Sequence, residues 1–302
     1  MSAGNGTDSW VVIQRNPLSG SGRGGRELLT LVSALRRRGY RVRMFSDRAQ
    51  LDRWVVRAAG DRRICCIVAA GGDGTVADLL NRHPTIPLAV LPLGTENLLA
   101  KYLGLRRDGE FLSGVIAAGV VRRLDSAFCN GRRFLLMVSC GPDAEVVECV
   151  HSRRRGHISR WDYVGPVIRS LLSATLYRFE VTAAELSQPV SGVHVIVSSV
   201  PKYGFDFPFS PAAEPDDGLL DVRVYHGGSR AAMLWHVLRL RLGWPIAAAE
   251  VTSFRTTAVS VRVQASAGVA HFQFDGDPGG ELPLSVVVAP SSMRLLVPAA
   301  AG

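Results

Sequence analysis

The chain has 302 residues, of which 47% are hydrophobic and 20% charged, a composition that excludes a disordered protein and allows two domains with separate cores. Its formal net charge of +9 favours anionic partners, such as nucleic acid, anionic lipid or nucleotide phosphate. The arginine clusters are scattered and have no aromatic residues between them, so nucleic acid is not expected as a partner.

Several other classes of protein find little support. No apolar run approaches the roughly 18 residues of a membrane span, and Met1 to Ser9 lacks the features of a signal peptide, so we expect a cytoplasmic protein. The five cysteines show no metal-ligand spacing and are interpreted as buried thiols. The seven histidines are isolated, and no zinc-protease or serine-hydrolase motif occurs.

The chain opens with an expected strand over residues 10–15, followed by Asn16-Pro17 and a loop rich in serine and glycine. An apolar-periodic segment then predicts a helix over 27–35, and a second strand is expected over 41–45. This alternation of strand and helix is typical of an α/β domain with a parallel sheet.

The first loop also fits a dinucleotide-binding pattern. Gly20, Gly22 and Gly25 match G-x-G-x-x-G, and Asp47 follows at the distance of a ribose-binding acid. An NAD(P)-binding protein is therefore the strongest rival interpretation. It leaves the later glycine turns of the chain without a use.

The most informative stretch begins with an apolar run over 64–70, which predicts a strand buried on both faces. The run ends at Gly71-Gly72-Asp73-Gly74-Thr75, and helical spacing continues over 76–81. Glycines let the backbone turn sharply and expose its N–H groups, and a helix N-terminus favours phosphate. The turn is therefore a candidate nucleotide site.

A second turn of the same kind follows the next expected strand, 87–91. Pro92-Leu93-Gly94-Thr95-Glu96-Asn97 leads into a helix-like segment over 98–103. The carboxyl ends of neighbouring parallel strands share one edge of a sheet, so we expect both turns to face one crevice.

The pattern changes after Leu124, where short strands follow one another without helices between most of them and predict a mostly antiparallel β domain. These strands are expected over 132–139, 179–186, 194–200, 219–225, 258–263, 271–274 and 284–288. Two helical insertions are expected, over 161–172 and 230–242. The second is amphipathic; packing against the sheet is the preferred interpretation, and membrane contact is the alternative.

The two glycine turns together resemble the diacylglycerol kinase catalytic family, which includes sphingosine and ceramide kinases and bacterial soluble lipid kinases. The resemblance extends over almost the whole chain. NAD kinases and phosphofructokinases share a Gly-Gly-Asp-Gly turn but are not known for the second turn. Four further segments match motifs of the family: Asn16-Pro17-Leu18-Ser19-Gly20, Gly141-Pro142-Asp143-Ala144, Asp217-Gly218-Leu219-Leu220-Asp221-Val222 and Asp275-Gly276-Asp277.

The resemblance implies a Rossmann-like α/β domain with a parallel sheet, a C-terminal β-sandwich domain and a nucleotide cleft between them. The first domain would cover residues 1–125, with about 288–302 returning to it in a last strand at 293–297. The second domain would cover residues 126–287.

The resemblance also implies an ATP site with Mg²⁺, in which Asp73 organises metal or phosphate. The residues expected to bind the nucleotide are Asn16, Pro17, Ser19, Gly20, Ser46, Gly71, Gly72, Asp73, Gly74, Thr75, Gly94, Thr95 and Asn97. A second, structural Mg²⁺ is expected on the Asp217 carboxylate and the backbone carbonyls of Glu214 and Leu219.

The expected catalytic residues are Asp277, Asp275 and Asp73, with Asp277 as general base. The family has glutamate where this chain has Asp277, and the aspartate side chain is one methylene shorter. A base must come within hydrogen-bond reach of the hydroxyl, so weakened or lost activity is an open alternative.

The expected function is transfer of the γ-phosphate of ATP to a lipid hydroxyl, with diacylglycerol as the commonest acceptor in the family. Sphingoid bases and ceramide remain open as substrates. A peripheral position at a membrane surface and a homodimer are the expected associations. The alternative is a nucleotide-binding member of the family without kinase activity.

Overall fold

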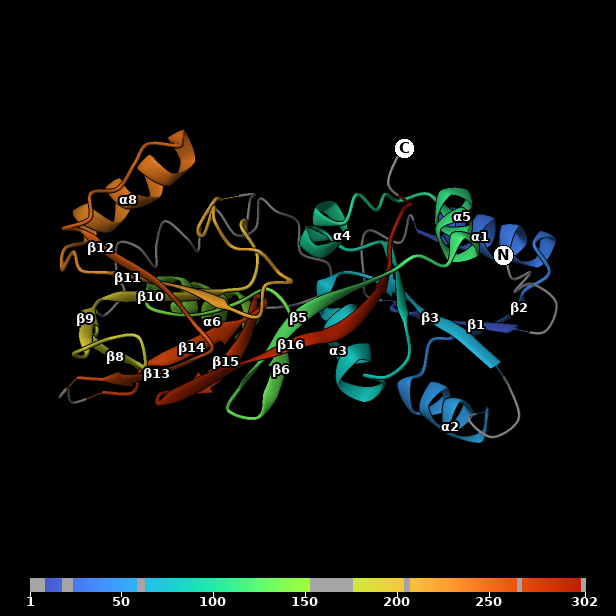
Figure 1. Ribbon diagram of the computed structural model, residues 1–302, viewed down its shortest axis with the longest axis horizontal. Coiled ribbons are helices and arrows are strands. Elements are labelled where there is room, and N and C mark those ends of the chain that lie inside the picture. The colour runs from blue at the N-terminus through green and yellow to red at the C-terminus, as the bar shows by residue number, and fades with distance from the viewer. Residues whose placement is uncertain are drawn as a thin grey trace. The chain divides into compact units, whose positions relative to one another are not determined.

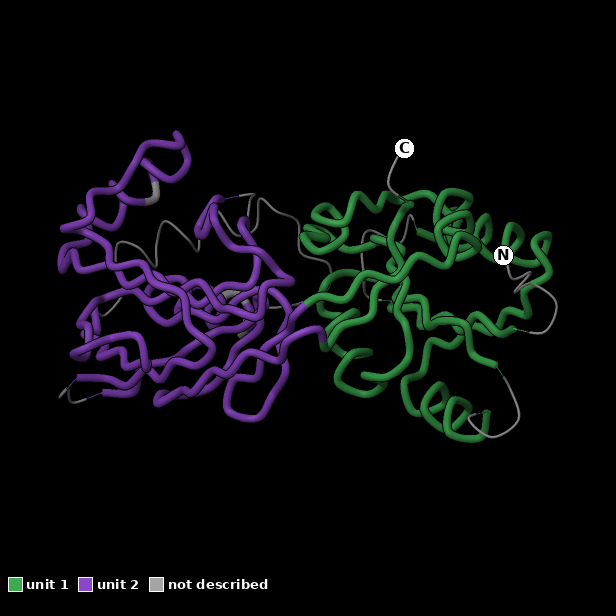
Figure 2. The backbone as a smooth tube through the Cα atoms, viewed as in Figure 1, with its two compact units in different colours: residues 1–124, 292–302 green, residues 125–291 purple. Residues whose placement is uncertain are grey.

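The computed structural model describes residues 9–17, 24–58, 63–152, 176–203, 207–264 and 268–299. The chain divides into two compact units (Figure 1, Figure 2). Unit 1 consists of residues 1–124 and 292–302, and unit 2 consists of residues 125–291.

Unit 1 is an α/β domain. Its strands are β1 (Ser9–Arg15), β2 (Arg41–Phe45), β3 (Arg63–Gly71) and β4 (Leu88–Pro92), and its helices are α1 (Gly25–Arg37), α2 (Arg48–Ala58), α3 (Asp73–Arg82), α4 (Leu98–Tyr102) and α5 (Gly109–Ala118). The four strands are parallel and lie in the order β2-β1-β3-β4. Strand β3 is buried from Cys66 to Gly71, as its continuous apolar sequence predicts.

Two strands run from one unit into the other. Strand β5 (Val121–Cys129) ends in unit 2, and β16 (Leu284–Leu296) ends in unit 1. Near its end, Leu295 of β16 pairs in parallel with Leu88 of β4. The N–H of Val297 then donates to the carbonyl of Val120 at 3.0 Å.

Unit 2 is built mainly of antiparallel strands. The described elements are β6 (Arg132–Phe134), β7 (Met137–Cys140), α6 (Pro142–Ser152), β8 (Phe179–Ala183), β9 (Val190–Gly192), β10 (His194–Ser198), β11 (Leu220–Tyr225), α8 (Arg230–Leu242), β12 (Val251–Thr256), β13 (Ala258–Val263), β14 (His271–Phe274) and β15 (Asp277–Glu281). One six-stranded sheet has the order β12-β11-β10-β7-β14-β15, and a second layer contains the neighbours β16-β13-β8-β9.

The core of unit 2 lies between these two layers. Val195 and Val197 of β10, on the six-stranded sheet, belong to the same buried cluster as Val259 and Val261 of β13 in the second layer. Alternate residues of each strand thus point to one shared interior, as in a β-sandwich. The expected fold class, a parallel α/β domain and a mostly antiparallel β-sandwich domain, is confirmed.

Some expected elements differ in their bounds. The strand expected over 132–139 is two strands, β6 and β7, because the backbone N–H groups between them bond to a side chain instead of to a neighbouring strand. The strands expected over 284–288 and 293–297 belong to the single long strand β16. Helix α3 begins at Asp73, three residues earlier than predicted.

Helix α8 has the predicted bounds, whereas the helix expected over 161–172 lies outside the described residues. Helices α2, α5 and α6 and strands β5, β9, β12 and β15 were not predicted from the sequence.

Candidate active site

The two glycine turns of unit 1 lie in contact. Only Gly72 separates the end of β3 from the start of α3, and Gly94 follows β4. A Cβ added to Gly94 would lie 2.5 Å from the Cα of Gly72 and 2.8 Å from Oδ1 of Asn97. The backbones approach so closely that a side chain at Gly94 would force the turns apart.

Asp73 joins these two turns. It is the first residue of α3, and its carboxylate accepts hydrogen bonds from the N–H of Leu98 at 2.9 Å and of Leu99 at 3.1 Å, in the first turn of α4. Burial raises the pKa of Asp73, although both of these hydrogen bonds lower it. Both carboxylate oxygens of Asp73 thus cap α4, so the side chain positions the turn.

Asn97 closes the second turn with its side chain. Its Oδ1 accepts from the N–H of Gly94 at 2.9 Å, and its Nδ2 donates to the carbonyl of Gly94 at 2.8 Å. The backbone of Asn97 is left-handed, with φ of 51°. Thr95, between these two residues, is exposed.

The start of the first loop reaches the same helix terminus. Asn16 donates from Nδ2 to Oγ1 of Thr75 at 3.2 Å, and its backbone N–H donates to the carbonyl of Ala70 at 3.1 Å. The first N–H groups of a helix have no partner within the helix. In α3 the N–H of Thr75 already donates to the carbonyl of Gly72 at 2.9 Å, so the N–H groups before Thr75 are the candidate phosphate donors beside the Asn16 amide.

The other residues predicted for this site lie as follows. Pro17 comes directly after Asn16, and Ser46 is exposed directly after β2. A Cβ on Gly74 would meet nothing within 4 Å. Ser19 and Gly20 lie outside the described residues.

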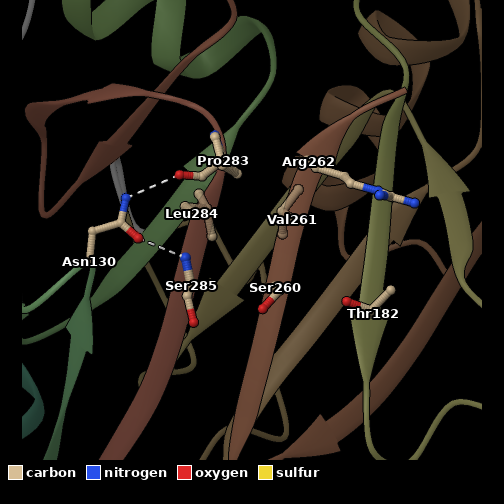
Figure 3. A pocket seen from close by; sticks show the side chains of 8 residues that line it. All are labelled: Asn130, Thr182, Ser260, Val261, Arg262, Pro283, Leu284 and Ser285. Atoms are coloured by element: carbon tan, nitrogen blue, oxygen red, sulfur yellow. Dashed lines mark hydrogen bonds between the residues drawn. The ribbon is translucent and has the colours of Figure 1, made fainter. Parts of the chain in front are cut away.

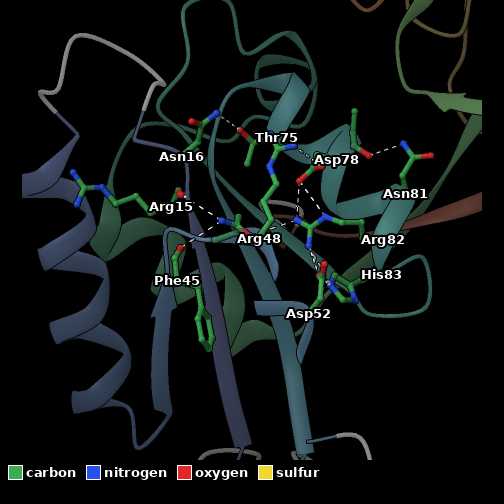
Figure 4. Close-up of polar contacts among 12 residues, drawn as sticks. Arg15, Asn16, Phe45, Arg48, Asp52, Thr75, Asp78, Asn81, Arg82 and His83 are labelled. Carbon is green, nitrogen blue, oxygen red and sulfur yellow. Dashed lines mark hydrogen bonds and ion pairs between the residues drawn. The ribbon is translucent and has the colours of Figure 1, made fainter. Parts of the chain in front are cut away.

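An ion-pair cluster holds α3 against α2 (Figure 4). Arg82 pairs with Asp78 at 2.7 Å and with Asp52, while Arg48 pairs with Asp78 at 3.2 Å. Burial alone would lower the pKa of Arg82, but the hydrogen bond and charge of Asp78, followed by Asp52, outweigh burial and raise it. His83 also contacts Asp52, at 2.7 Å. The cluster fixes the helix whose N-terminus forms the turn.

In unit 2, the carboxylate of Asp275 binds backbone N–H groups. It accepts from the backbone N–H groups of Leu135 at 2.7 Å, Leu136 at 2.7 Å and Met137 at 3.1 Å. These are the residues at which β6 gives way to β7, so Asp275 stabilises that corner. Asp277 begins β15 and is partly exposed.

A chain of hydrogen bonds connects the Asp275-Gly276-Asp277 turn with α6. The N–H of Gly276 donates to Gln273 Oε1 at 3.0 Å, and Gln273 Nε2 donates to Ser139 Oγ at 2.6 Å. Ser139 donates in turn to Asp143, whose Oδ1 lies 3.0 Å from His194 Nε2. The motifs at 141–144 and 275–277 are thereby parts of one polar network.

The charge partners in this network decide the protonation of Asp143. Burial alone would raise its pKa, but the charge and hydrogen bond of His194, together with the Ser139 hydroxyl, outweigh burial and lower it. Asp143 is therefore held as a carboxylate.

Asp217, the carboxylate predicted to hold a structural cation, already has two partners. Asp217 accepts from the N–H of Leu219 at 2.9 Å through Oδ1 and forms an ion pair with Arg255 through Oδ2. Glu214 is exposed. In the described part of the chain, no group of three or more His, Cys, Asp or Glu residues could hold a metal ion. A cation at Asp217 stays a prediction, and it would have to displace the guanidinium of Arg255.

Sequence reasoning missed Asp125, Gln273 and His194. Asp125 is 1% exposed on β5, and its carboxylate accepts from the N–H of Gly218 at 2.7 Å and of Ser291 at 2.6 Å. The neighbouring residues gave no signal for this burial, because Arg122, Arg123 and Ser126 make the segment polar; a buried carboxylate requires partners, and here they come from distant segments.

A pocket of about 240 Å³ lies elsewhere, on the second layer of unit 2, along β8, β13 and β16 (Figure 3). Asn130 bonds there to the carbonyl of Pro283 at 3.1 Å and to the N–H of Ser285 at 2.9 Å. None of its lining residues was predicted as a site residue, and the pocket is smaller than typical ligand pockets. We do not assign it to the site.

Together, the parallel sheet with two glycine turns and the following β-sandwich define a protein with an α/β domain and a β-sandwich domain. The family description "Diacylglycerol kinase catalytic domain" matches residues 9–129, and "YegS C-terminal NAD kinase beta sandwich-like domain" matches residues 136–297. The chain belongs to the diacylglycerol kinase family, and this prediction from the sequence is confirmed.

Curated relatives are similar at modest identity. The chain is 25% identical over 298 residues to a diacylglycerol kinase of Mycobacterium tuberculosis, covering 95% of both chains. It is 24% identical over 277 residues to the Bacillus subtilis diacylglycerol kinase, covering 89% of each. It covers 54% of an uncharacterized Synechocystis protein, at 25% identity.

Solved structures share the fold. A crystal structure of a Bacillus anthracis diacylglycerol kinase has a TM-score of 0.70 over 97% of this chain and 98% of that chain, at 17% identity. A second structure from the same organism has a TM-score of 0.75 over 98% of both chains, at 18% identity. At these identities the likeness concerns the fold.

Proposed function

We propose that this protein is an ATP-dependent lipid kinase, with diacylglycerol as acceptor and phosphatidic acid as product. The observation that carries the proposal is the pair of glycine turns in contact at Gly72 and Gly94, tied together by Asp73. A dinucleotide site at the first loop alone would have no use for this pair. The names of the curated relatives support a lipid acceptor.

The nucleotide phosphates would bind at the N-terminus of α3, beside Asn16 and Thr75, with exposed Thr95 on the second turn. Asp73 would act by positioning, since its carboxylate already accepts two backbone hydrogen bonds. ATP would bind together with Mg²⁺, and the chemistry that the ion would supply is neutralisation of phosphate charge.

In the transfer step, the oxygen of the lipid hydroxyl forms a bond to the γ-phosphorus. The bond between that phosphorus and the oxygen shared with the β-phosphate breaks, and ADP leaves. The hydroxyl proton goes to a carboxylate, which we assign to Asp277, because Asp275 is bonded to three backbone N–H groups.

The protein would act on lipid at the surface of a membrane, from the cytoplasmic side. Within the described residues, no helix has the length and apolar character needed to cross a bilayer. A peripheral enzyme would therefore need a surface that meets lipid.

The test is a kinase assay with labelled ATP across diacylglycerol, a sphingoid base and ceramide. We expect labelled phosphatidic acid from diacylglycerol, and Mg·ATP binding without NAD binding in calorimetry. Label in another lipid would correct the substrate only. Mg·ATP binding without transfer to any lipid would favour the alternative, a nucleotide-binding member of the family without kinase activity. The reason for that loss would be the Asp277 side chain, which is one methylene shorter than the glutamate of the family.

A further inference from the structure

Helix α8 of unit 2 has two apolar faces. The helix connects β11 and β12 and extends away from them (Figure 1). At about 100° per residue, Met233, His236 and Leu240 lie on one side. Leu234, Trp235, Leu238 and Leu242 lie on the opposite side, so a single packing partner leaves one of these faces uncovered.

The inner face is held in unit 2. Met233, His236 and Leu240 are 6%, 5% and 7% exposed. The His236 ring lies 5.5 Å from the ring of Tyr225, measured between centroids. Arg239 pairs with Glu250 at 2.6 Å, just before β12. The predicted packing of this helix against the sheet accounts for this face alone.

The outer face, defined as Leu234, Trp235, Leu238, Leu242 and Trp244, is open. These side chains are 40%, 47%, 45%, 50% and 50% exposed. Scattered exposed apolar residues are normal on a protein surface, but a contiguous set that includes two tryptophans marks an interaction site.

The helix terminus places the second tryptophan on this face. The N–H of Trp244 donates to the carbonyl of Arg239 at 2.8 Å across the left-handed Gly243, so the chain turns back at the helix end. The rings of Trp235 and Trp244 then meet edge to face, with centroids 6.2 Å apart. Paired tryptophans are typical of side chains that lie at a membrane–water interface.

Charge favours a lipid surface over a second copy of the chain. Helix α8 carries no Asp or Glu; Arg230 and Arg241 lie on one side of the outer face, and Arg239, which pairs with Glu250, lies on the other side. A two-fold contact between two copies would bring the arginine rows together. Anionic headgroups would complement them while the apolar side chains enter the acyl boundary.

We propose that the outer face of α8 is a docking surface for anionic membranes. The inference deepens the proposed function, because a lipid kinase must reach its substrate in a bilayer, but its test does not require turnover. The face supplies apolar contact through leucine and tryptophan, and Arg230 and Arg241 supply attraction to the headgroups.

The test is co-sedimentation of the full chain with vesicles of phosphatidylcholine, with and without phosphatidylglycerol. We expect binding that requires phosphatidylglycerol, and about a tenfold or greater loss of binding for Leu238→Asp. Leu29→Asp is the matched control, because Leu29 is a 68% exposed leucine on α1 in unit 1. Equal binding by Leu238→Asp and the parent, or equal losses in both variants, would overturn the proposal.

Tryptophan fluorescence gives a second measurement. Vesicles of brominated phosphatidylcholine mixed with phosphatidylglycerol should quench the tryptophan fluorescence of the parent, and the double variant Trp235→Phe with Trp244→Phe should lose that quenching. If size-exclusion shows a dimer that Leu238→Asp dissociates while vesicle binding persists, the outer face is a dimer interface and the proposal is wrong.

The outcome is separable from the proposed function. Leu238→Asp should lose activity on vesicles and keep activity on detergent-dispersed lipid. If the parent phosphorylates no lipid but binds anionic vesicles through α8, the kinase proposal fails and the docking proposal stands. If the parent is active and Leu238→Asp binds vesicles normally, only the docking proposal fails.

Discussion

Unit 1 and unit 2 each contain an aspartate next to glycine, and both aspartates hold the backbone. Asp73 accepts hydrogen bonds from two N–H groups of α4, and Asp275 accepts from three N–H groups between β6 and β7. Both residues were predicted to be catalytic. The comparison shows that each carboxylate shapes a turn of its own unit, and the catalytic roles of Asp73 and Asp275 stay predictions.

The largest expected effect concerns Asp277. Asp277→Asn should lower turnover by about 10²–10⁴-fold, because the variant removes the proposed base. Mg·ATP affinity in calorimetry should stay unchanged, since the loss belongs to the transition state. Asp277→Glu should retain or raise activity by restoring reach. An active Asp277→Asn variant beside an Asp275→Asn variant that is inactive although still folded would reverse the assignment.

Replacing Asp275 should cost more unfolding free energy than replacing Asp73, because Asp275 accepts more backbone hydrogen bonds. Asp275→Ala leaves three N–H groups without their acceptor and should cost about 3 kcal/mol or more of unfolding free energy, at about 1 kcal/mol or more for each group. Asp73→Ala leaves two, and should cost about 2 kcal/mol. Denaturant unfolding of both variants measures the difference. Equal or reversed costs would contradict this use of the carboxylates.

Local and non-local signals explain what could be predicted from the sequence. The strand β3 and its glycine turn were predicted because apolar runs and glycines act within a few residues. The partners of Asp275 lie up to 140 positions away, and Gln273 bonds to Ser139 across 134. Such contacts depend on how distant strands pair in the folded protein, and a local sequence pattern does not predict that pairing.

The same distinction applies to roles within the site. The resemblance implies catalytic roles for Asp73 and Asp275, but motif matching does not show which backbone N–H groups each carboxylate contacts. The resemblance also implies a cation at Asp217, and it could not show that Arg255, 38 positions further along the chain, forms an ion pair with this carboxylate. Asp125 was missed because its two N–H partners come from distant segments.

Alanine substitutions at two glycines of unit 1, Gly94 and Gly74, should have different effects on stability. Gly94→Ala should cost about 1–3 kcal/mol, because its Cβ would lie 2.5 Å from Gly72 Cα and the two turns must separate. Gly74→Ala, inside α3 with nothing within 4 Å of its Cβ, should be neutral or stabilise by up to about 1 kcal/mol. Thermal unfolding of the pair tests the contact. Similar melting temperatures would mean that the turns do not touch.

The smallest expected effect is the pH dependence of stability, in which Asp73 and Asp143 act with opposite signs. Burial raises the pKa of Asp73, whereas His194 lowers the pKa of Asp143 against the effect of burial. A lowered folded-state pKa contributes stability that is present above the unfolded value, about 3.9 for aspartate, and is lost as pH falls through the folded value. A raised pKa acts in reverse, so the contribution of Asp73 weakens stability as pH rises from the unfolded to the folded value.

Asp143→Asn should therefore flatten the loss of stability on acidification below about pH 4, because the variant has no proton to take up there. Asp73→Asn should remove the opposite slope, so that stability no longer falls as pH rises above about pH 4. Denaturant unfolding of the parent and both variants between acid and neutral pH measures these slopes. The Ser139→Ala variant is the matched check, because it removes one hydrogen bond from Asp143 and leaves His194 in place, and it should reduce the acid-dependent loss only in part. If Asp143→Asn keeps the full acid dependence of the parent, the charge of His194 does not lower the pKa of Asp143. Burial would then dominate the pKa of Asp143, as it dominates the pKa of Asp73.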